Sequence, residues 1–180
     1  MRRLRYQVAS SLDGYIAGAK GEFDWIVMDP EIDFGELFKQ YDTVVMGRRT
    51  FEVMLKEGGS GSMPGLDVVV FSQTLRQKDF LAVSVVNTNP AETIRSLKAK
   101  PGKDIWLYGG GELFRALLDA GVVDTVEPAI IPVLLGGGVP LLPMAANRTR
   151  LTLIRHRLYS QSGIMLLEYA VRNSEEVDSP

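Results

Sequence analysis

Short apolar runs and segments of helical periodicity alternate along most of the chain. Runs rich in β-branched and aliphatic residues predict buried strands at residues 5–10, 43–46, 67–71, 81–86, 104–107 and 125–131. Apolar residues three or four positions apart predict a helix at residues 113–118, and two long strands at 151–159 and 164–171 close the pattern. Strands that alternate with helices and end in a hairpin predict an α/β fold. We expect a mostly parallel central sheet with helices on both faces and a C-terminal antiparallel hairpin.

Two pairs of residues predict helix starts. Asp29-Pro30 and Asn89-Pro90 each place an N-cap residue before a proline that suits the first helical position. We therefore expect one helix from Pro30, with an apolar face that reaches Tyr41, and a second helix from Pro90.

The chain predicts a single domain. Its 180 residues are enough to bury a sizeable core, and the Gly/Ser-rich segment at residues 57–65 is too short for a domain linker. We expect the domain to span residues 1–172 and the polar residues 173–180 to form a flexible tail.

Composition excludes several classes of function. The net charge is −2 and the basic residues are scattered, so nucleic acid is not an expected partner. The absence of cysteine and the single histidine, His156, exclude thiolate catalysis, disulfides and zinc sites of Cys or multiple-His type, and we expect no metal. Magnesium held by carboxylates stays open, and His156 is expected to be structural. No run approaches the ~20 apolar residues of a membrane span, so we expect a soluble cytoplasmic protein.

Residues 109–111 are three consecutive glycines between a predicted strand and a predicted helix. Backbone without side chains lets a phosphate approach the first amides of a helix, at the positive end of its dipole. A tight turn is the alternative, although it explains one or two glycines more readily than three. Tyr108, Glu112 and Leu113 flank the glycines and belong to the same predicted site.

A second junction has the same character. Gly47 permits close approach, Arg48 and Arg49 supply forked cations, and Thr50 supplies a hydroxyl near a helix start. Two adjacent arginines suit a phosphate monoester, but they are also explained as solvated surface residues. Ser72 follows another strand, where a small polar residue is either a ligand contact or a turn residue. Together these junctions predict a ligand with separated phosphates, such as an adenine dinucleotide with a 2′-phosphate.

Two common nucleotide-binding motifs do not fit. The Rossmann fingerprint needs G-x-G-x-x-G after an early strand, but the triple glycine lacks the last glycine and lies past mid-chain. A P-loop fails as well, because the chain has no Gly-Lys-Ser/Thr ending.

Four segments, taken in order, resemble the dihydrofolate reductase superfamily: ASSLDGYIA at 9–17, VMGRRTF at 45–51, FS at 71–72 and YGGGELF at 108–114. Three further matches resemble the branch that contains the reductase domain of riboflavin-biosynthesis deaminase-reductases: SLDGYIA at 11–17, PVLLGGG at 132–138 and YSQSG at 159–163. The resemblance covers about residues 4–171 and implies a dihydrofolate reductase-like three-layer fold.

The resemblance also implies a function. It implies NADPH binding and hydride transfer to a small heterocyclic substrate, pterin-like or pyrimidinone-like. Residues that match the glycines at 109–111 hold the pyrophosphate, and those that match Arg48, Arg49, Thr50 and Ser72 surround the adenosine phosphate. Residues that match Ala9, Ile16 and Ala17 line the nicotinamide. Relatives commonly pair, so a homodimer is expected. Without cysteine the chain cannot carry the zinc-dependent deaminase, so we expect a stand-alone reductase-like domain.

The catalytic acid has no clear match. Dihydrofolate reductases use a carboxylate near the start of their first helix, and Asp33 is our candidate, although a solvated helix-face acid explains it equally well. Asp13 either contacts substrate or stabilises an Asp-Gly turn. Trp25 is expected in the wall of the substrate pocket and Trp106 in the core. The main rival is a non-catalytic dinucleotide-binding or regulatory protein, and a structural assembly protein is a third possibility.

Overall fold

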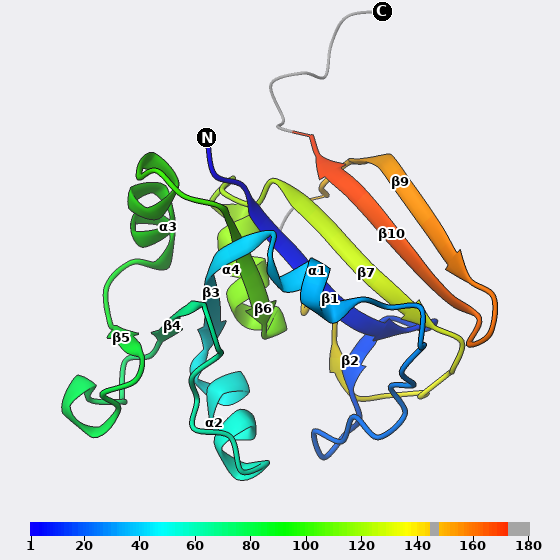
Figure 1. Ribbon diagram of the computed structural model, residues 1–180, viewed down its shortest axis with the longest axis horizontal. Coiled ribbons are helices and arrows are strands. Elements are labelled where there is room, and N and C mark those ends of the chain that lie inside the picture. The colour runs from blue at the N-terminus through cyan, green and yellow to red at the C-terminus, as the bar shows by residue number, and fades with distance from the viewer. Residues whose placement is uncertain (145–147, 173–180) are drawn as a thin grey trace, which may run out of the picture.

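An eight-stranded sheet in the order β5-β4-β3-β6-β1-β7-β10-β9 forms the centre of the molecule (Figure 1). The computed structural model describes residues 1–144 and 148–172. Neighbouring strands from β5 to β7 are parallel, and β10 and β9 are antiparallel, so the predicted fold class is confirmed. The strands are β1 (Leu4–Ser11), β3 (Tyr41–Gly47), β4 (Asp67–Phe71), β5 (Ser84–Val86), β6 (Asp104–Gly109), β7 (Thr125–Ile131), β9 (Leu151–Tyr159) and β10 (Ile164–Val171).

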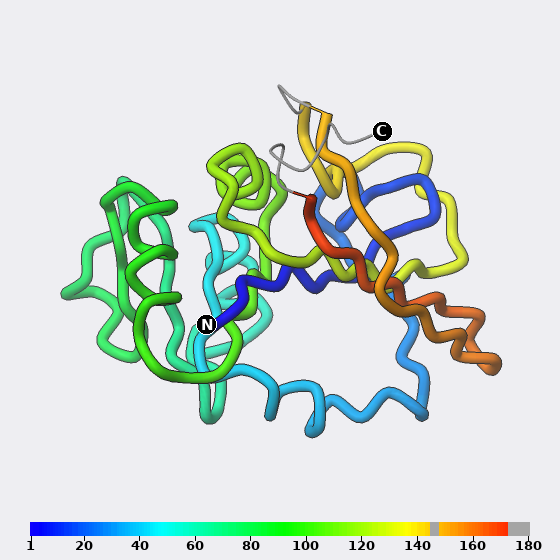
Figure 2. Tube along the Cα trace, turned by 90° about the horizontal axis from the view of Figure 1, so that it is seen from above, coloured from blue at the N-terminus to red at the C-terminus, as the bar shows by residue number. Residues whose placement is uncertain are grey.

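Helices cover both faces of the sheet because successive strand residues point to opposite sides. Val45 and Val69 pack in one core cluster with Ile94 of α3 (Pro90–Ala99) and Leu117 of α4 (Gly111–Asp119). Their neighbours in β3 and β4 pack in a second cluster with Phe51 of α2 (Arg48–Lys56). α1 (Phe34–Phe38) lies on this second side, and Figure 2 shows it and α4 on opposite sides of the sheet. A short 3-10 helix, η1 (Gln77–Asp79), precedes β5.

A small second sheet joins two distant loops. β2 (Tyr15–Ala17) pairs antiparallel with β8 (Val139–Pro140). Gly138 permits this approach: its φ is +146°, and a Cβ there would lie 2.2 Å from the Ala17 carbonyl oxygen. The third glycine of the 136–138 run is therefore required by packing between the two loops.

The predicted helix start at Asp29-Pro30 is wrong. α1 begins at Phe34, with Asp33 as its N-cap, and the chain enters β3 at Tyr41. Asp29 is buried and accepts hydrogen bonds from the backbone N–H groups of Glu31 and Ser162. An aspartate before proline serves an Asx-type turn as well as a helix cap, and the contact with Ser162 cannot be foreseen from local sequence.

Two more of the expected segments, the strand at 81–86 and the tail at 173–180, can be compared with the described residues. The strand expected at 81–86 is shorter in the structure, where β5 covers only Ser84–Val86. A turn precedes it and leaves Leu81 90% exposed. The tail expected at 173–180 lies outside the described residues. Within the described ranges, no helix is both long and apolar enough to cross a membrane.

Candidate functional site

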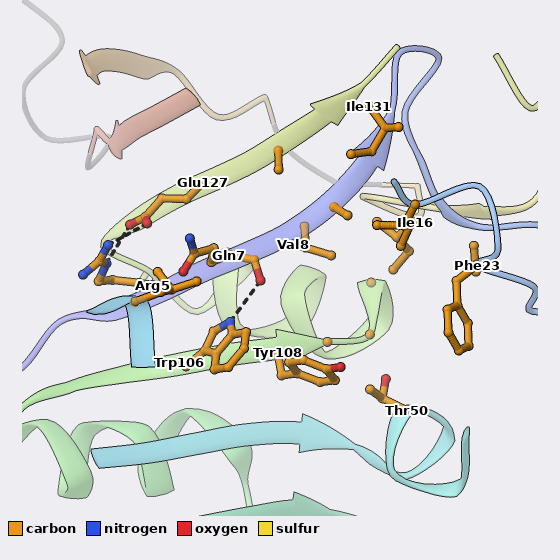
Figure 3. A pocket seen from close by; sticks show the side chains of 18 of the residues that line it. Arg5, Gln7, Val8, Ile16, Phe23, Thr50, Trp106, Tyr108, Glu127 and Ile131 are labelled. Carbon is orange, nitrogen blue, oxygen red and sulfur yellow. Dashed lines mark hydrogen bonds and ion pairs between the residues drawn. The ribbon is translucent and has the colours of Figure 1, made fainter. Parts of the chain in front are cut away.

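A cleft of about 1520 Å³ runs along the sheet face that carries α1 and α2 (Figure 3). At one end it is lined by the β3–α2 and β6–α4 junctions, including Gly47 and Gly109, the last residues of the two strands. From there it continues over side chains of β1, β7, β9 and β10, beneath the segment at residues 23–38. The cleft therefore opens at the carboxyl ends of parallel strands, where ligands bind in open α/β sheets.

Two helix N-termini meet at the first end of the cleft. Gly47 is the N-cap of α2 and Gly110 is the N-cap of α4, and no side chain in the described ranges caps either helix. A Cβ on Gly47 would lie 3.9 Å from the Gly110 nitrogen, so the two ends are adjacent. The first amides of both helices are thus available to an anion, and both dipoles favour negative charge there.

At each of the three positions 109–111, a different structural feature disfavours a side chain. Gly109 has φ of +151°, which other residues rarely adopt. A Cβ on Gly110 would lie 3.2 Å from the Thr50 hydroxyl oxygen, and one on Gly111 would lie 2.7 Å from the Pro140 carbonyl oxygen. The peptide bond between Gly109 and Gly110 is cis. Thr50 and the β8 loop therefore enclose the glycines from two sides.

Arg48 and Arg49 both line the cleft beside these glycines. The Arg48 guanidinium lies 2.8 Å from the Glu52 carboxylate, one turn along α2. Exposed pairs of this kind contribute little, about 0–1 kcal/mol, so an anion can compete for Arg48. Arg49 is exposed and forms no ion pair with the residues that the structure describes.

The cleft brings together nearly all of the predicted cofactor residues. They come from β1, β2, the β3–α2 junction and the β6–α4 junction. The members that line the cleft are Ala9, Ile16, Ala17, Gly47, Arg48, Arg49, Thr50, Tyr108, Gly109, Gly110, Gly111, Glu112 and Leu113. Ser72 is the exception, because it is absent from the described lining. It is 7% exposed, and its hydroxyl accepts the backbone N–H groups of Thr74 and Leu75. The structure thus favours the turn-residue alternative for Ser72.

A buried ion pair lies at the other end of the cleft floor. Arg5 and Glu127 are each 3% exposed, and the guanidinium donates to both carboxylate oxygens at 2.7 Å. Thr125 donates to the same carboxylate at 2.6 Å, and Arg5 also donates to Gln40 at 2.7 Å. Burial alone would lower the pKa of Arg5, but the hydrogen bond and charge of Glu127 outweigh it and raise the pKa above its usual value. Arg5 is therefore always charged and held in one geometry.

Sequence reasoning missed this pair. The available signal was a charged residue inside each of two otherwise apolar strands, since charged side chains are rarely buried unless they are paired. Arg5 lies opposite Thr125 in the parallel register of β1 and β7, which brings Glu127 within reach. The register itself could not be derived from the sequence.

Aromatic rings form the wall between the two ends. The Trp106 indole donates to the Gln7 carbonyl at 3.0 Å, and its ring centroid lies 5.0 Å from that of Tyr108 and 5.5 Å from that of Phe38. Tyr41 donates its hydroxyl to the Gln7 side-chain oxygen at 2.9 Å. Figure 3 shows Tyr108 in the cleft between Trp106 and Thr50. The Tyr108 hydroxyl has no hydrogen bond within the described ranges, and burial raises its pKa, so it stays protonated.

The three candidate substrate and catalytic residues are dispersed. Asp33 lines the cleft, but one of its carboxylate oxygens accepts the Glu36 N–H as the cap of α1. Asp13 lies outside the described lining. The Asp13 carboxylate accepts hydrogen bonds from the Ser11 hydroxyl and from the backbone N–H groups of Leu135 and Gly136, which lower its pKa. Asp13 thereby holds the loop before β8.

The structure places the two tryptophans in different surroundings. Trp25 is missing from the described lining, because its ring packs against the cluster of Ile131, Tyr159 and Ile164 while its indole donates to the Glu22 carbonyl. Trp106 belongs to the core, as expected, and also lines the cleft.

Comparison with known proteins places this geometry among reductase-type folds. A family model described as the RibD C-terminal domain matches residues 2–165. The uncharacterised protein YyaP of Bacillus subtilis is 35% identical over 179 residues, covering 93% of this chain and 94% of that protein. The crystal structure of a putative riboflavin biosynthesis protein from Shewanella sp. PV-4 has a TM-score of 0.81 at 27% identity, covering 95% and 99% of the two chains. Dihydrofolate reductase from Enterococcus faecalis, complexed with NADP(H), has a TM-score of 0.69 at 19% identity, covering 95% and 97%, and so shares the fold.

Proposed function

Since the chain belongs to the RibD C-terminal domain family, we propose that it is an NADPH-dependent reductase that transfers hydride to a small pterin-like or pyrimidinone-like heterocycle. One observation carries the proposal. Two uncapped helix N-termini, with Arg48 and Arg49 beside them, face the same cleft as a separate aromatic and polar end. This arrangement fits a ligand with a pyrophosphate and a further phosphate at one end and a flat ring at the other.

The described residues fit the cofactor. The amides of residues 110–113 and the Thr50 hydroxyl would hold the pyrophosphate, because a Cβ on Gly110 would fill the space in front of Thr50. Arg48 and Arg49 would hold the 2′-phosphate through forked, charge-assisted hydrogen bonds. Ala9, Ile16 and Ala17 would lie along the nicotinamide, as the family resemblance implies.

The protein's share of the reaction is positioning. NADPH supplies the hydride when it is bound. The aromatic wall of Trp106 and Tyr108 would orient a planar substrate, and the segment at residues 23–38 would lie over the bound ligand. Asp33 has one carboxylate oxygen beyond the one that caps α1 and is our candidate to hold the proton that the substrate receives.

A non-catalytic cofactor-binding protein is the second candidate. One observation favours it: Glu127 and Glu168, the carboxylates on the described cleft floor, are both engaged in ion pairs with arginines. Asp33 is partly committed to capping. A protein with this site could bind the dinucleotide without a competent acid.

Two measurements in sequence separate the candidates. Calorimetric titration with NADPH tests the cofactor site, and loss of absorbance at 340 nm over a panel of pteridines, pyrimidinones and quinoid compounds then tests turnover. The proposal predicts saturable binding and turnover of at least one compound. Saturable binding with no turnover favours the non-catalytic protein, and absence of binding contradicts both.

A further inference from the structure

We propose that the substrate end of the cleft selects a planar ring that carries no phosphate or carboxylate group. The inference rests on the proposed function and narrows its substrate class. We define the substrate end as Arg5 and Gln7 of β1, Trp106 and Tyr108 of β6, the lining residues of β7, β9 and β10, and residues 31–38. Figure 3 shows Arg5, Gln7 and Glu127 there, away from Thr50 and Ile16.

The charge balance of this end opposes an anion. Within the described lining it holds three arginines and five carboxylates. The arginines are Arg5, Arg155 and Arg157, and the carboxylates are Glu31, Asp33, Glu36, Glu127 and Glu168. Lys39, just outside the lining, pairs with Glu36, so Asp33 is the one of the five carboxylates without an ion pair in the described ranges. Its negative charge in a partly enclosed cleft repels a phosphate, because the low-dielectric walls focus the field.

Each of the three arginines is already paired. Arg5 is held by Glu127 in the buried pair, Arg155 lies 2.7 Å from Glu168, and Arg157 lies 3.3 Å from Glu31. The Arg157 guanidinium also lies over the Tyr159 ring, 4.5 Å from its centroid. A phosphate that recruited Arg5 would leave the buried Glu127 carboxylate unpaired, which is costly. Arg155 and Arg157 are exposed, so pairing alone protects them far less from an anion. The contrast is Arg49 at the cofactor end, which has no such partner in the described part of the chain.

The walls instead suit a flat, uncharged ring. Phe34, Phe38, Trp106 and Tyr108 present aromatic surface to this end, and the indole of Trp106 is fixed by its bond to the Gln7 carbonyl. Since the Gln7 side-chain oxygen accepts from Tyr41, its amide nitrogen is left to donate. That nitrogen has no partner within residues 1–144 and 148–172. A ring with a carbonyl or ring-nitrogen acceptor can stack on the aromatic wall and accept this bond.

Matched ligand pairs test the inference without NADPH or turnover. The probes are 6-hydroxymethylpterin against its phosphate ester, and uridine against uridine 5′-monophosphate, with quenching of tryptophan fluorescence as the signal. We expect the uncharged member of at least one pair to bind at least about tenfold more tightly than its phosphorylated partner. Trp106→Phe should abolish the quenching, since Trp25 lies outside the described lining.

A gain-of-binding variant makes the test sharper. The double variant Glu31→Gln with Glu168→Gln frees the exposed Arg157 and Arg155 guanidinium groups and leaves the buried Arg5–Glu127 pair intact. It should bind the phosphorylated members roughly tenfold better than the unmodified protein. Glu36→Gln is the comparison variant: it removes one carboxylate from the same end but frees Lys39, outside the lining, rather than a lining arginine, so it should gain less than the double variant.

Three outcomes would overturn the inference. In the first, neither uncharged compound binds. In the second, the phosphorylated members bind the unmodified protein as tightly as their uncharged partners or more tightly. In the third, Glu36→Gln gains as much affinity for the phosphorylated compounds as the double variant does. None of these results depends on NADPH. Failure of the cofactor proposal and failure of this inference are therefore distinguishable.

Discussion

Gly110 leaves the N-terminus of α4 open to the cleft because it carries no side chain. Its φ of −96° is ordinary, so a larger residue can adopt the backbone, but the added Cβ would lie 3.2 Å from the Thr50 hydroxyl oxygen. Gly110→Val should therefore fold yet obstruct the pyrophosphate position, and the affinity for NADPH and for NADH should fall together by roughly tenfold or more. Gly137→Val is the control, because a Cβ there meets no described atom within 4 Å. Normal binding by folded Gly110→Val would remove the pyrophosphate assignment.

Arg48 and Arg49 decide between the two nicotinamide cofactors. If they hold the 2′-phosphate, replacing both with alanine should raise the dissociation constant of NADPH by roughly 100-fold or more, because two lost charge-assisted hydrogen bonds at about 1.5–3 kcal/mol each sum to at least about 3 kcal/mol. NADH lacks that phosphate and should be nearly unaffected. Arg150→Ala controls for loss of one surface charge away from the cleft. An equal loss for both cofactors, measured by calorimetry, would contradict the assignment.

Asp33 combines a cap and a candidate acid, and two substitutions separate these roles. Asparagine is as good an N-cap as aspartate but cannot hold a transferable proton, so Asp33→Asn should keep the melting temperature and lower kcat by about 100-fold. Asp33→Ala should also lose about 1 kcal/mol of unfolding free energy. If Asp33→Asn turns over normally, Asp33 is only a cap and another group supplies the proton.

The β2–β8 pair depends on Asp13, which ties the turn after β1 to the backbone of Leu135 and Gly136. Hydrogen bonds from Ser11 and from those N–H groups hold the pKa of Asp13 below its ordinary 3.8. Stabilisation by a carboxyl of lowered pKa is complete above the ordinary value and is lost as pH falls through the lowered one. The protein should therefore be more stable than Asp13→Asn at pH 7 and at pH 5, with the difference shrinking in stronger acid. Thermal unfolding of both proteins between pH 7 and 3 measures this, and a difference that grows in acid would contradict it.

Elements with a clear local pattern were predictable, and elements set by distant contacts were not. β4, β7, β9 and β10 have the predicted bounds, because each is a run rich in strand-forming residues that ends in turn residues. α3 begins at Pro90 with Asn89 as its cap, as predicted. α1 fails because Asp29 is drawn to Ser162, more than a hundred residues away. The cofactor end of the cleft was predictable from strand–glycine–helix junctions, whereas its floor depends on the β1–β7 register that pairs Arg5 with Glu127.

The edge strand β9 is our candidate surface for a homodimer. β9 leaves Leu151, Leu153, Ile154 and Leu158 between 42% and 54% exposed. These exposed apolar side chains flank Arg155, His156 and Arg157, and together they offer apolar surface at an edge strand that can pair with another chain. We expect a homodimer through this edge, and light scattering after gel filtration should give twice the chain mass. Leu153→Glu with Leu158→Glu should give a monomer, while Leu81→Glu, at a position 90% exposed elsewhere, should not. A monomeric unmodified protein would contradict the expectation.

The complete cleft exists only when the fold is assembled, since its lining comes from β1, the β3–α2 and β6–α4 junctions, the β2–β8 pair and the terminal hairpin. We propose that one end of this cleft holds a dinucleotide with a 2′-phosphate. Calorimetric titration of the purified protein with NADPH and, separately, with NADH tests that claim most directly. The proposed site predicts one cofactor bound per chain and at least tenfold tighter binding of NADPH. Equal affinity for the two cofactors, or no saturable binding of NADPH, would contradict it.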